Sequence, residues 1–68
     1  MREISIRGQT IRLGQLLKLA GIADSGADAK ALLAEGLVTV NGEPEARRGR
    51  QLGVGDEVAV GDELVRVT

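Results

Sequence analysis

The spacing of apolar residues along this 68-residue chain changes from two to about 3.6 and then back to two. Apolar and polar residues alternate over residues 3–7, which predicts a short edge strand ahead of Gly8. From Arg12 the apolar residues recur at helical spacing, and Gly21 stands where helices commonly end in a left-handed residue. We therefore predict a short helix over residues 12–20. Its apolar face comprises Leu13, Leu16, Leu17 and Ala20.

A second helix is predicted to end at Gly36. Asp24 or Ser25 can cap its N-terminus, and Asp28 three residues after Ser25 approximates a reciprocal capping arrangement. At 100° per residue, Lys30 lies on one flank of the apolar face, and the acidic residues lie on the other flank. The helix therefore sorts its charges by side. The apolar face comprises Ala29, Leu32 and Leu33.

The remaining apolar residues alternate with polar ones between turn-forming pairs. Residues 38–40 lead into Asn41-Gly42, the favoured pair for a two-residue hairpin turn because both positions tolerate positive φ. Three later strands are predicted, with turns at Gly55-Asp56 and Gly61-Asp62. Their apolar residues are Leu52 and Val54, then Val58 and Val60, then Leu64 or Val65 with Val67. The order predicts an α+β domain over residues 1–68, with two helices packed on a small, mostly antiparallel sheet.

Composition removes several classes of function. The chain has no cysteine and no histidine, and so lacks the thiolate nucleophile, the usual neutral-pH base and the ligands of zinc sites. We expect no catalysis, no cofactor, no small-molecule substrate and no metal, and we interpret the acidic residues of segment 56–63 as exposed turn and strand residues. Without aromatic residues the chain also lacks base-stacking platforms. Without a long apolar run we expect no membrane span and no export signal, which favours the cytoplasm.

The formal net charge of −1 conceals an uneven distribution. Residues 1–50 carry a balance of +2, whereas residues 51–68 carry −3. Short helices on one side of a sheet can bring their basic residues beside the arginine-rich segment 47–50, and Gly26 leaves backbone N–H groups accessible to a phosphate at a helix start. The candidate basic residues are Arg12, Lys18, Lys30, Arg47, Arg48 and Arg50.

Residues 12–42 resemble the S4 RNA-binding domain without a gap. The residues that carry the resemblance are Arg12-Leu13, Leu17, Gly21, Ser25, Ala29, Lys30, Leu32-Leu33, Gly36, Val38 and Val40-Asn41-Gly42. The later Gly55-Asp56-x-Val58 is similar to the family's second-strand signature, so the resemblance covers most of residues 12–60. Among the branches of the family, the chain most resembles the short standalone bacterial S4-like proteins.

The resemblance implies non-catalytic binding of structured RNA, ribosomal or transfer, through phosphate and shape contacts, with a ribosomal particle as a candidate partner. It implies that Asn41-Gly42 forms a hairpin turn, whose part is structural before any contact with RNA. It also implies that Ser25 caps a helix. With the charge argument, the expected RNA-binding residues are Arg12, Lys18, Ser25, Gly26, Lys30, Asn41, Arg47, Arg48 and Arg50. Two positions depart from the family pattern: Gly14 replaces the usual Asp after Arg-Leu, and Gly26 replaces an Arg that is often a phosphate contact.

Two other classes of protein are alternatives. Residues 38–43 followed by residues 55–58 are also similar to ubiquitin-like sulfur carriers. Those carriers need a C-terminal Gly-Gly, whereas this chain ends Val67-Thr68. The alternative is therefore a protein-interaction domain that has the carrier fold without the carrier function. A toxin-like or hydrolytic enzyme would have to work with carboxylates, Ser or Thr without support from His or Cys.

Overall fold

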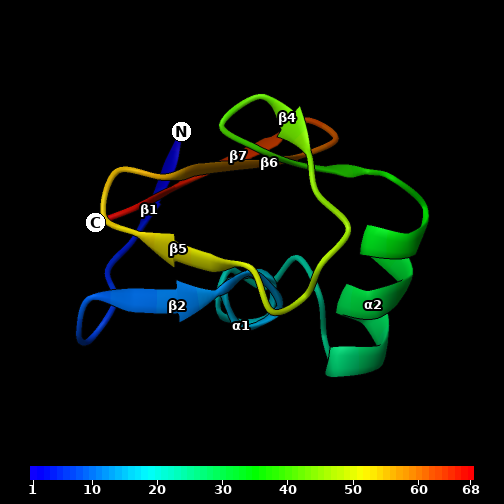
Figure 1. Ribbon diagram of the computed structural model, residues 1–68, viewed down its shortest axis with the longest axis horizontal. Coiled ribbons are helices and arrows are strands. Elements are labelled where there is room, and N and C mark those ends of the chain that lie inside the picture. Colours follow the sequence, from blue (N-terminus) through cyan, green and yellow to red (C-terminus); the bar gives the residue numbers. More distant parts are fainter.

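The computed structural model describes residues 1–68 and contains two helices and seven short strands. In chain order the elements are β1 (Arg2–Ile4), β2 (Thr10–Arg12), α1 (Leu13–Leu19), α2 (Gly26–Ala34), β3 (Val38–Val40), β4 (Glu43–Pro44), β5 (Gln51–Gly53), β6 (Glu57–Val60) and β7 (Glu63–Val67). Five strands form one sheet in the order β1-β7-β6-β3-β4, and β2 pairs with β5 in a separate sheet (Figure 1). Neither helix is long and apolar enough to cross a membrane.

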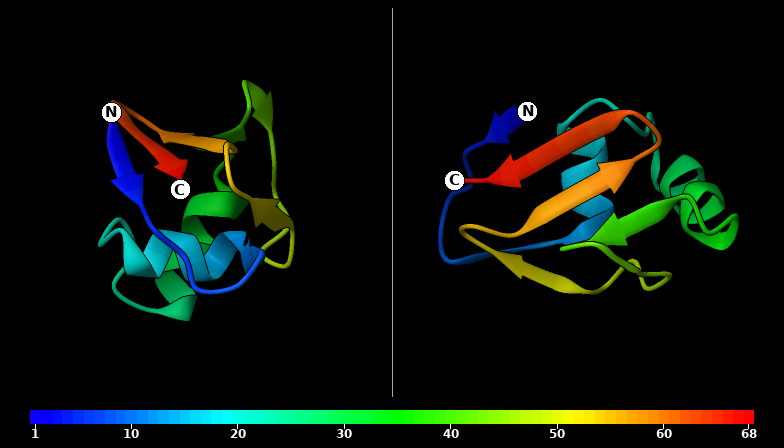
Figure 2. Two further views of the ribbon diagram at one scale, coloured as in Figure 1. Left: turned by 90° about the vertical axis from the view of Figure 1, so that its left-hand side faces the viewer. Right: turned by 90° about the horizontal axis from the view of Figure 1, so that it is seen from above.

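The five-stranded sheet is antiparallel except where its edge strand β1 runs parallel to β7. Both helices lie on one side of this sheet (Figure 2). The prediction of an α+β fold with a mostly antiparallel sheet is therefore confirmed, as is the edge strand near the N-terminus. That strand ends at Ile4 rather than continuing to Ile6, although the Ile6 N–H still donates to the Thr68 carbonyl.

The core is entirely aliphatic and lies between the helices and the five-stranded sheet. The predicted face of α1 is buried throughout, whereas in α2 Leu32 is only half-buried beside the buried Ala29 and Leu33. In β7, Val65 rather than Leu64 enters the core, because pairing with β6 sets Val65 opposite the buried Val58. Strand alternation then places the side chains of Glu57 and Arg66 on the opposite face of the sheet from the helices.

The pairing of β2 with β5 differs from the prediction. Residues 10–12 form a strand, and the first helix begins at Leu13 with Arg12 as its N-cap. Leu52 is buried opposite Ile11 in this second sheet, but Val54 lies beyond the strand and is 72% exposed. At the end of the strand the Gly53 N–H bonds to the Asp56 carboxylate, at 2.8 Å, inside the following turn. The prediction that Val54 belongs to a strand was therefore wrong.

The Asn41-Gly42 turn is confirmed, with φ values of 52° and 87° between β3 and β4. Asn41 also joins this hairpin to β6: its amide donates to Asp56 Oδ1 at 3.1 Å, and its oxygen accepts the Glu57 N–H at 2.9 Å. Hydrogen bonds from the Gly53 N–H and from Asn41 hold the pKa of Asp56 below its usual value. The Asn41 side chain thus has a structural part in the sheet.

Ser25, and not Asp24, caps α2. Its hydroxyl accepts the Asp28 N–H at 3.1 Å. We predict that Ser25→Ala lowers the free energy of unfolding by about 1 kcal/mol, because one helix amide loses its acceptor. Asp24→Ala, at an exposed position without such a bond, should stay within about 0.5 kcal/mol of the wild type. Urea unfolding followed by circular dichroism measures both, and a greater loss in Asp24→Ala would contradict this assignment.

Candidate nucleic-acid interface

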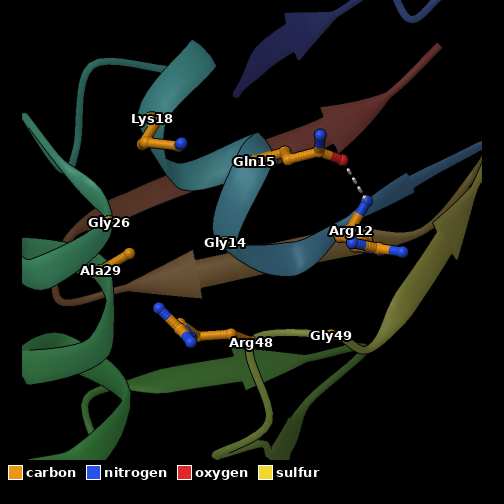
Figure 3. A pocket seen from close by; sticks show the side chains of 8 residues that line it. All are labelled: Arg12, Gly14, Gln15, Lys18, Gly26, Ala29, Arg48 and Gly49. Carbon is orange, nitrogen blue, oxygen red and sulfur yellow. Dashed lines mark hydrogen bonds between the residues drawn. The ribbon is translucent and has the colours of Figure 1, made fainter.

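An open hollow of about 510 Å³ lies where α1, the start of α2 and segment 47–50 meet (Figure 3). We call it the basic hollow. It is lined by Arg12, Gly14, Gln15, Lys18, Gly26, Ala29, Arg48 and Gly49. Three of these side chains are cationic and none is acidic. None of the ion pairs in the structure involves Arg12, Lys18 or Arg48, so all three charges are available to an anion.

Segment 47–50 is attached to the first turn of α1 by backbone hydrogen bonds. The Leu13 N–H donates to the Arg50 carbonyl at 2.8 Å, and the Gly14 N–H donates to the Arg48 carbonyl at 3.0 Å. The first amides of a helix have no acceptor within it, so the segment satisfies two of them. A Cβ added to Gly14 would lie 3.6 Å from the Arg48 Cβ and carbonyl oxygen. The stem of Arg48 therefore lies close to α1 at Gly14.

Arg12, Gln15 and Lys18 line the same side of the hollow because they are spaced three residues apart. The intervening Leu16 and Leu17 are turned into the core. Gln15 Oε1 accepts the Arg12 N–H at 3.3 Å, a bond drawn in Figure 3. The amide NH₂ of Gln15 remains as a further donor. This side of the hollow therefore presents one guanidinium, one amide donor and one ammonium.

Glu45 pairs with two of the three arginines in segment 47–50 and leaves the third unpaired. Its carboxylate accepts hydrogen bonds from the Arg47 guanidinium, at 3.1 and 3.2 Å, and from Arg50 at 3.0 Å. It also accepts the backbone N–H groups of Ala46 and Arg47, and its side chain is only 8% exposed. Arg47 and Arg50 thus share one carboxylate, which offsets one of their two positive charges, whereas Arg48 lines the basic hollow without an acidic partner.

The structure brings four of the nine predicted RNA-binding residues to the basic hollow: Arg12, Lys18, Gly26 and Arg48. The other five lie elsewhere. Ser25 caps α2, Lys30 is exposed on α2 outside the hollow, Asn41 holds the hairpin turn, and Arg47 and Arg50 pair with Glu45. Sequence reasoning did not select Gln15, Ala29, Gly49 or the pairing of Glu45. The one available signal was the position of Glu45, which lies two residues before Arg47.

No acidic side chain lines the basic hollow, and no three acidic residues gather where they would hold a metal ion. Glu57 accepts from Arg66 at 2.6 Å, and Glu63 lies 3.6 Å from Arg2. The first of these pairs is on the face of the sheet opposite the helices. Glu57 and the basic hollow therefore lie on different sides of the five-stranded sheet.

The family model described as the S4 domain matches residues 4–68 of this chain. The chain belongs to the S4 domain family. This assignment confirms the family that the sequence resembles, and the S4 fold replaces the ubiquitin-like alternative.

This S4 domain has curated relatives in two well-known bacteria. It is 54% identical over 57 residues to the probable ribosome maturation protein RlbA of Bacillus subtilis, covering 84% of this chain and 80% of the relative. It is 40% identical over 57 residues to YbcJ of Escherichia coli, covering 84% and 81%. The confirmed resemblance to short S4-like proteins rests on these relatives.

Solved structures extend the comparison to the fold. The solution structure of Escherichia coli YbcJ, described as revealing an αL motif involved in RNA binding, matches all of this S4 domain and 87% of that chain. The TM-score is 0.76 at 36% identity. The crystal structure of 30S ribosomal protein S4e from Thermoplasma acidophilum matches 88% of this S4 domain and 32% of that chain, with a TM-score of 0.66 at 26% identity.

The two residues at which this S4 domain departs from the family pattern both line the basic hollow. Gly14 and Gly26 stand where the pattern has a carboxylate and a guanidinium. A Cβ on Gly26 would meet nothing within 4 Å, so the space beside it is unfilled. A carboxylate at position 14 would begin beside the Arg48 stem. The two glycines therefore enlarge the hollow and leave it without an acidic side chain.

Glu45 should keep its ion pairs in acid. The Arg47 and Arg50 guanidinium groups, with the Arg47 N–H, lower the pKa of Glu45 from 4.5 to about 2. Because this pKa is lower in the folded state, the resulting stabilisation is complete above about pH 4.5, declines as the pH falls and is absent below about pH 2. We predict that the side-chain carboxyl signal of Glu45 titrates near pH 2 in an NMR experiment.

A matched pair of variants tests this pH dependence. Glu45→Gln should lose the part of the acid dependence of stability that falls between about pH 4.5 and pH 2. Glu43→Gln removes the same charge from an exposed position in β4 without an ion pair, and should keep the wild-type dependence. If the two variants show the same acid unfolding, the Glu45 ion pairs do not contribute to the pH dependence of stability.

Proposed function

We propose that this chain is a non-catalytic RNA-binding protein that recognises structured RNA through phosphate and shape contacts at the basic hollow. The observation that carries the proposal is the convergence of Arg12, Lys18 and Arg48 on one hollow that contains no acidic side chain. The relatives support the same conclusion, because one is named a ribosome maturation protein and the structure of another is described by an RNA-binding motif. We therefore infer that the RNA is ribosomal. We also propose that the protein acts in the cytoplasm as a single domain.

The chemistry of the basic hollow suits phosphate. The guanidinium groups of Arg12 and Arg48 can each make two parallel hydrogen bonds to phosphate oxygens, and Lys18 adds a compact charge. Gln15 supplies a neutral donor, and Gly26 supplies a backbone N–H at the positive end of α2. Phosphate contacts of this kind fix the position and orientation of the protein on RNA, whereas base contacts confer sequence preference. We therefore expect recognition of RNA shape more than of sequence.

Five predicted residues have other places in this proposal. Lys30 is exposed on α2, where a longer RNA backbone can reach it beyond the hollow. Arg47 and Arg50 hold the arginine segment through Glu45, while Ser25 and Asn41 stabilise the elements around it. Direct contact of these five residues with RNA stays a prediction.

Crosslinking in the native cell tests the proposed function. Ultraviolet crosslinking of the tagged protein, followed by sequencing of the attached RNA, should recover ribosomal RNA fragments clustered at one structured region. A tagged variant with Arg12, Lys18 and Arg48 replaced by alanine provides the background. Recovery of no RNA above that background would refute the proposed function. Enrichment of transfer RNA would retain RNA binding and refute the ribosomal assignment.

A further inference from the structure

The basic hollow is larger than a phosphate group requires. The hollow is open, and its volume of about 510 Å³ is comparable to the about 300–1,000 Å³ of clefts that bind small organic ligands. A phosphate of a continuous duplex would meet only the charged rim. The remaining volume therefore has room for a group that enters the space between α1 and α2.

The inner wall of the hollow is bare backbone. Gly14, Gly26 and Gly49 contribute no side chain, and Ala29 contributes one methyl group. A Cβ on the partly buried Gly26 would meet nothing within 4 Å, so neighbouring side chains do not fill the space beside it. The charged groups come from positions 12, 18 and 48 around it (Figure 3). The site thus combines cationic groups with an uncharged wall formed by glycine backbone and one alanine.

We infer that the basic hollow receives one unpaired nucleotide of structured RNA, with its own phosphate and the two neighbouring phosphates held by Arg12, Lys18 and Arg48. Its base would enter beside Gly26 and Ala29. This inference rests on the proposed function. In the absence of aromatic residues, the base can pack against the methyl group of Ala29 and the aliphatic stem of Arg48, whose guanidinium group is left for a phosphate. The bases of a continuous duplex remain stacked and cannot enter, so a bulged nucleotide is the better ligand.

Two RNA hairpins with identical stems, one carrying a single bulged nucleotide, test this inference. The wild-type protein should bind the bulged hairpin at least about fivefold more tightly, which corresponds to about 1 kcal/mol, the lower end of what one base contact provides in single-strand binding. Gly26→Leu fills the hollow without changing charge, and Gly26 is not in the left-handed region, so a leucine fits its backbone. This variant should bind both hairpins with the affinity that the wild type has for the hairpin without a bulge.

Ala27→Leu is the matched control, because it adds a leucine to α2 at an exposed neighbouring position outside the hollow. It should keep the preference for the bulge, and thermal unfolding of both variants checks that they fold. Equal wild-type affinity for the two hairpins, or a preference that survives in Gly26→Leu, would overturn the inference. If binding to both hairpins is equal and still weakened by salt, the proposed function stands. If neither hairpin binds, and no other structured RNA does, the proposed function fails as well.

Discussion

Replacing Arg12, Lys18 and Arg48 together by alanine should weaken binding to structured RNA by about 500-fold at 0.1 M salt. Each duplex-like phosphate contact adds about 0.9 to the slope of log affinity against log salt, so three contacts add about 2.7. A slope of about 2.7 changes the affinity by about 500-fold over the tenfold range from 1 M to 0.1 M salt, so the three contacts together contribute about 500-fold at 0.1 M salt. The same variant should therefore lose about 2.7 from its salt slope, which fluorescence anisotropy with a labelled RNA measures directly.

The control for this prediction carries the same change in net charge at a different place. Arg2 and Arg66 pair with carboxylates on the five-stranded sheet, and Arg7 is exposed; none of them lines the basic hollow. Replacing these three by alanine should lower the salt slope by less than about 1, because only long-range attraction is lost. Equal losses in the two triple variants would mean that net charge, and not the hollow, determines affinity.

Leu52→Ala should leave the protein largely unfolded at 25 °C. Leu52 is 0% exposed and packs from β5 into the core. Truncating a buried leucine to alanine costs about 2–5 kcal/mol, as much as the ~3–5 kcal/mol that a core of this size supplies in total. Since β5 directly follows segment 47–50, loss of this strand also releases Arg48 from α1, and RNA binding should be lost with the fold.

Val54→Ala, two residues away in the same segment, is the natural comparison. Val54 is 72% exposed, so its truncation should change the free energy of unfolding by no more than about 0.5 kcal/mol. Urea unfolding by circular dichroism compares the two variants. A destabilisation of Leu52→Ala below about 1 kcal/mol would contradict the packing described for the second sheet.

The elements that the sequence predicts well depend on local signals. The second helix is predicted correctly because helical spacing, the Ser25 cap and Gly36 all lie within a dozen residues. The hairpin is predicted because Asn41 and Gly42 both favour positive φ, whatever surrounds them. The S4 assignment follows from the order of such local features, which the family model matches over residues 4–68.

The features that the sequence does not predict depend on contacts between distant segments. β2 and β5 are three residues each and about forty residues apart, so neither carries enough periodicity to indicate its partner. Likewise, three arginines in segment 47–50 look equivalent in the sequence. Only the folded loop shows that Glu45 pairs with Arg47 and Arg50, and that the Gly14 N–H places Arg48 at the hollow.

Mapping the contact by NMR shows whether RNA binds at the basic hollow. In a titration of the ¹⁵N-labelled protein with its crosslinked ribosomal RNA fragment, the backbone amide signals of Gly14, Gly26 and Gly49 should move strongly. Those of Ala59 and Leu64, on the opposite face of the five-stranded sheet, should stay in place. Strong shifts at Ala59 and Leu64, with unmoved signals from the three glycines, would show that RNA binds the other face of the sheet and not the basic hollow.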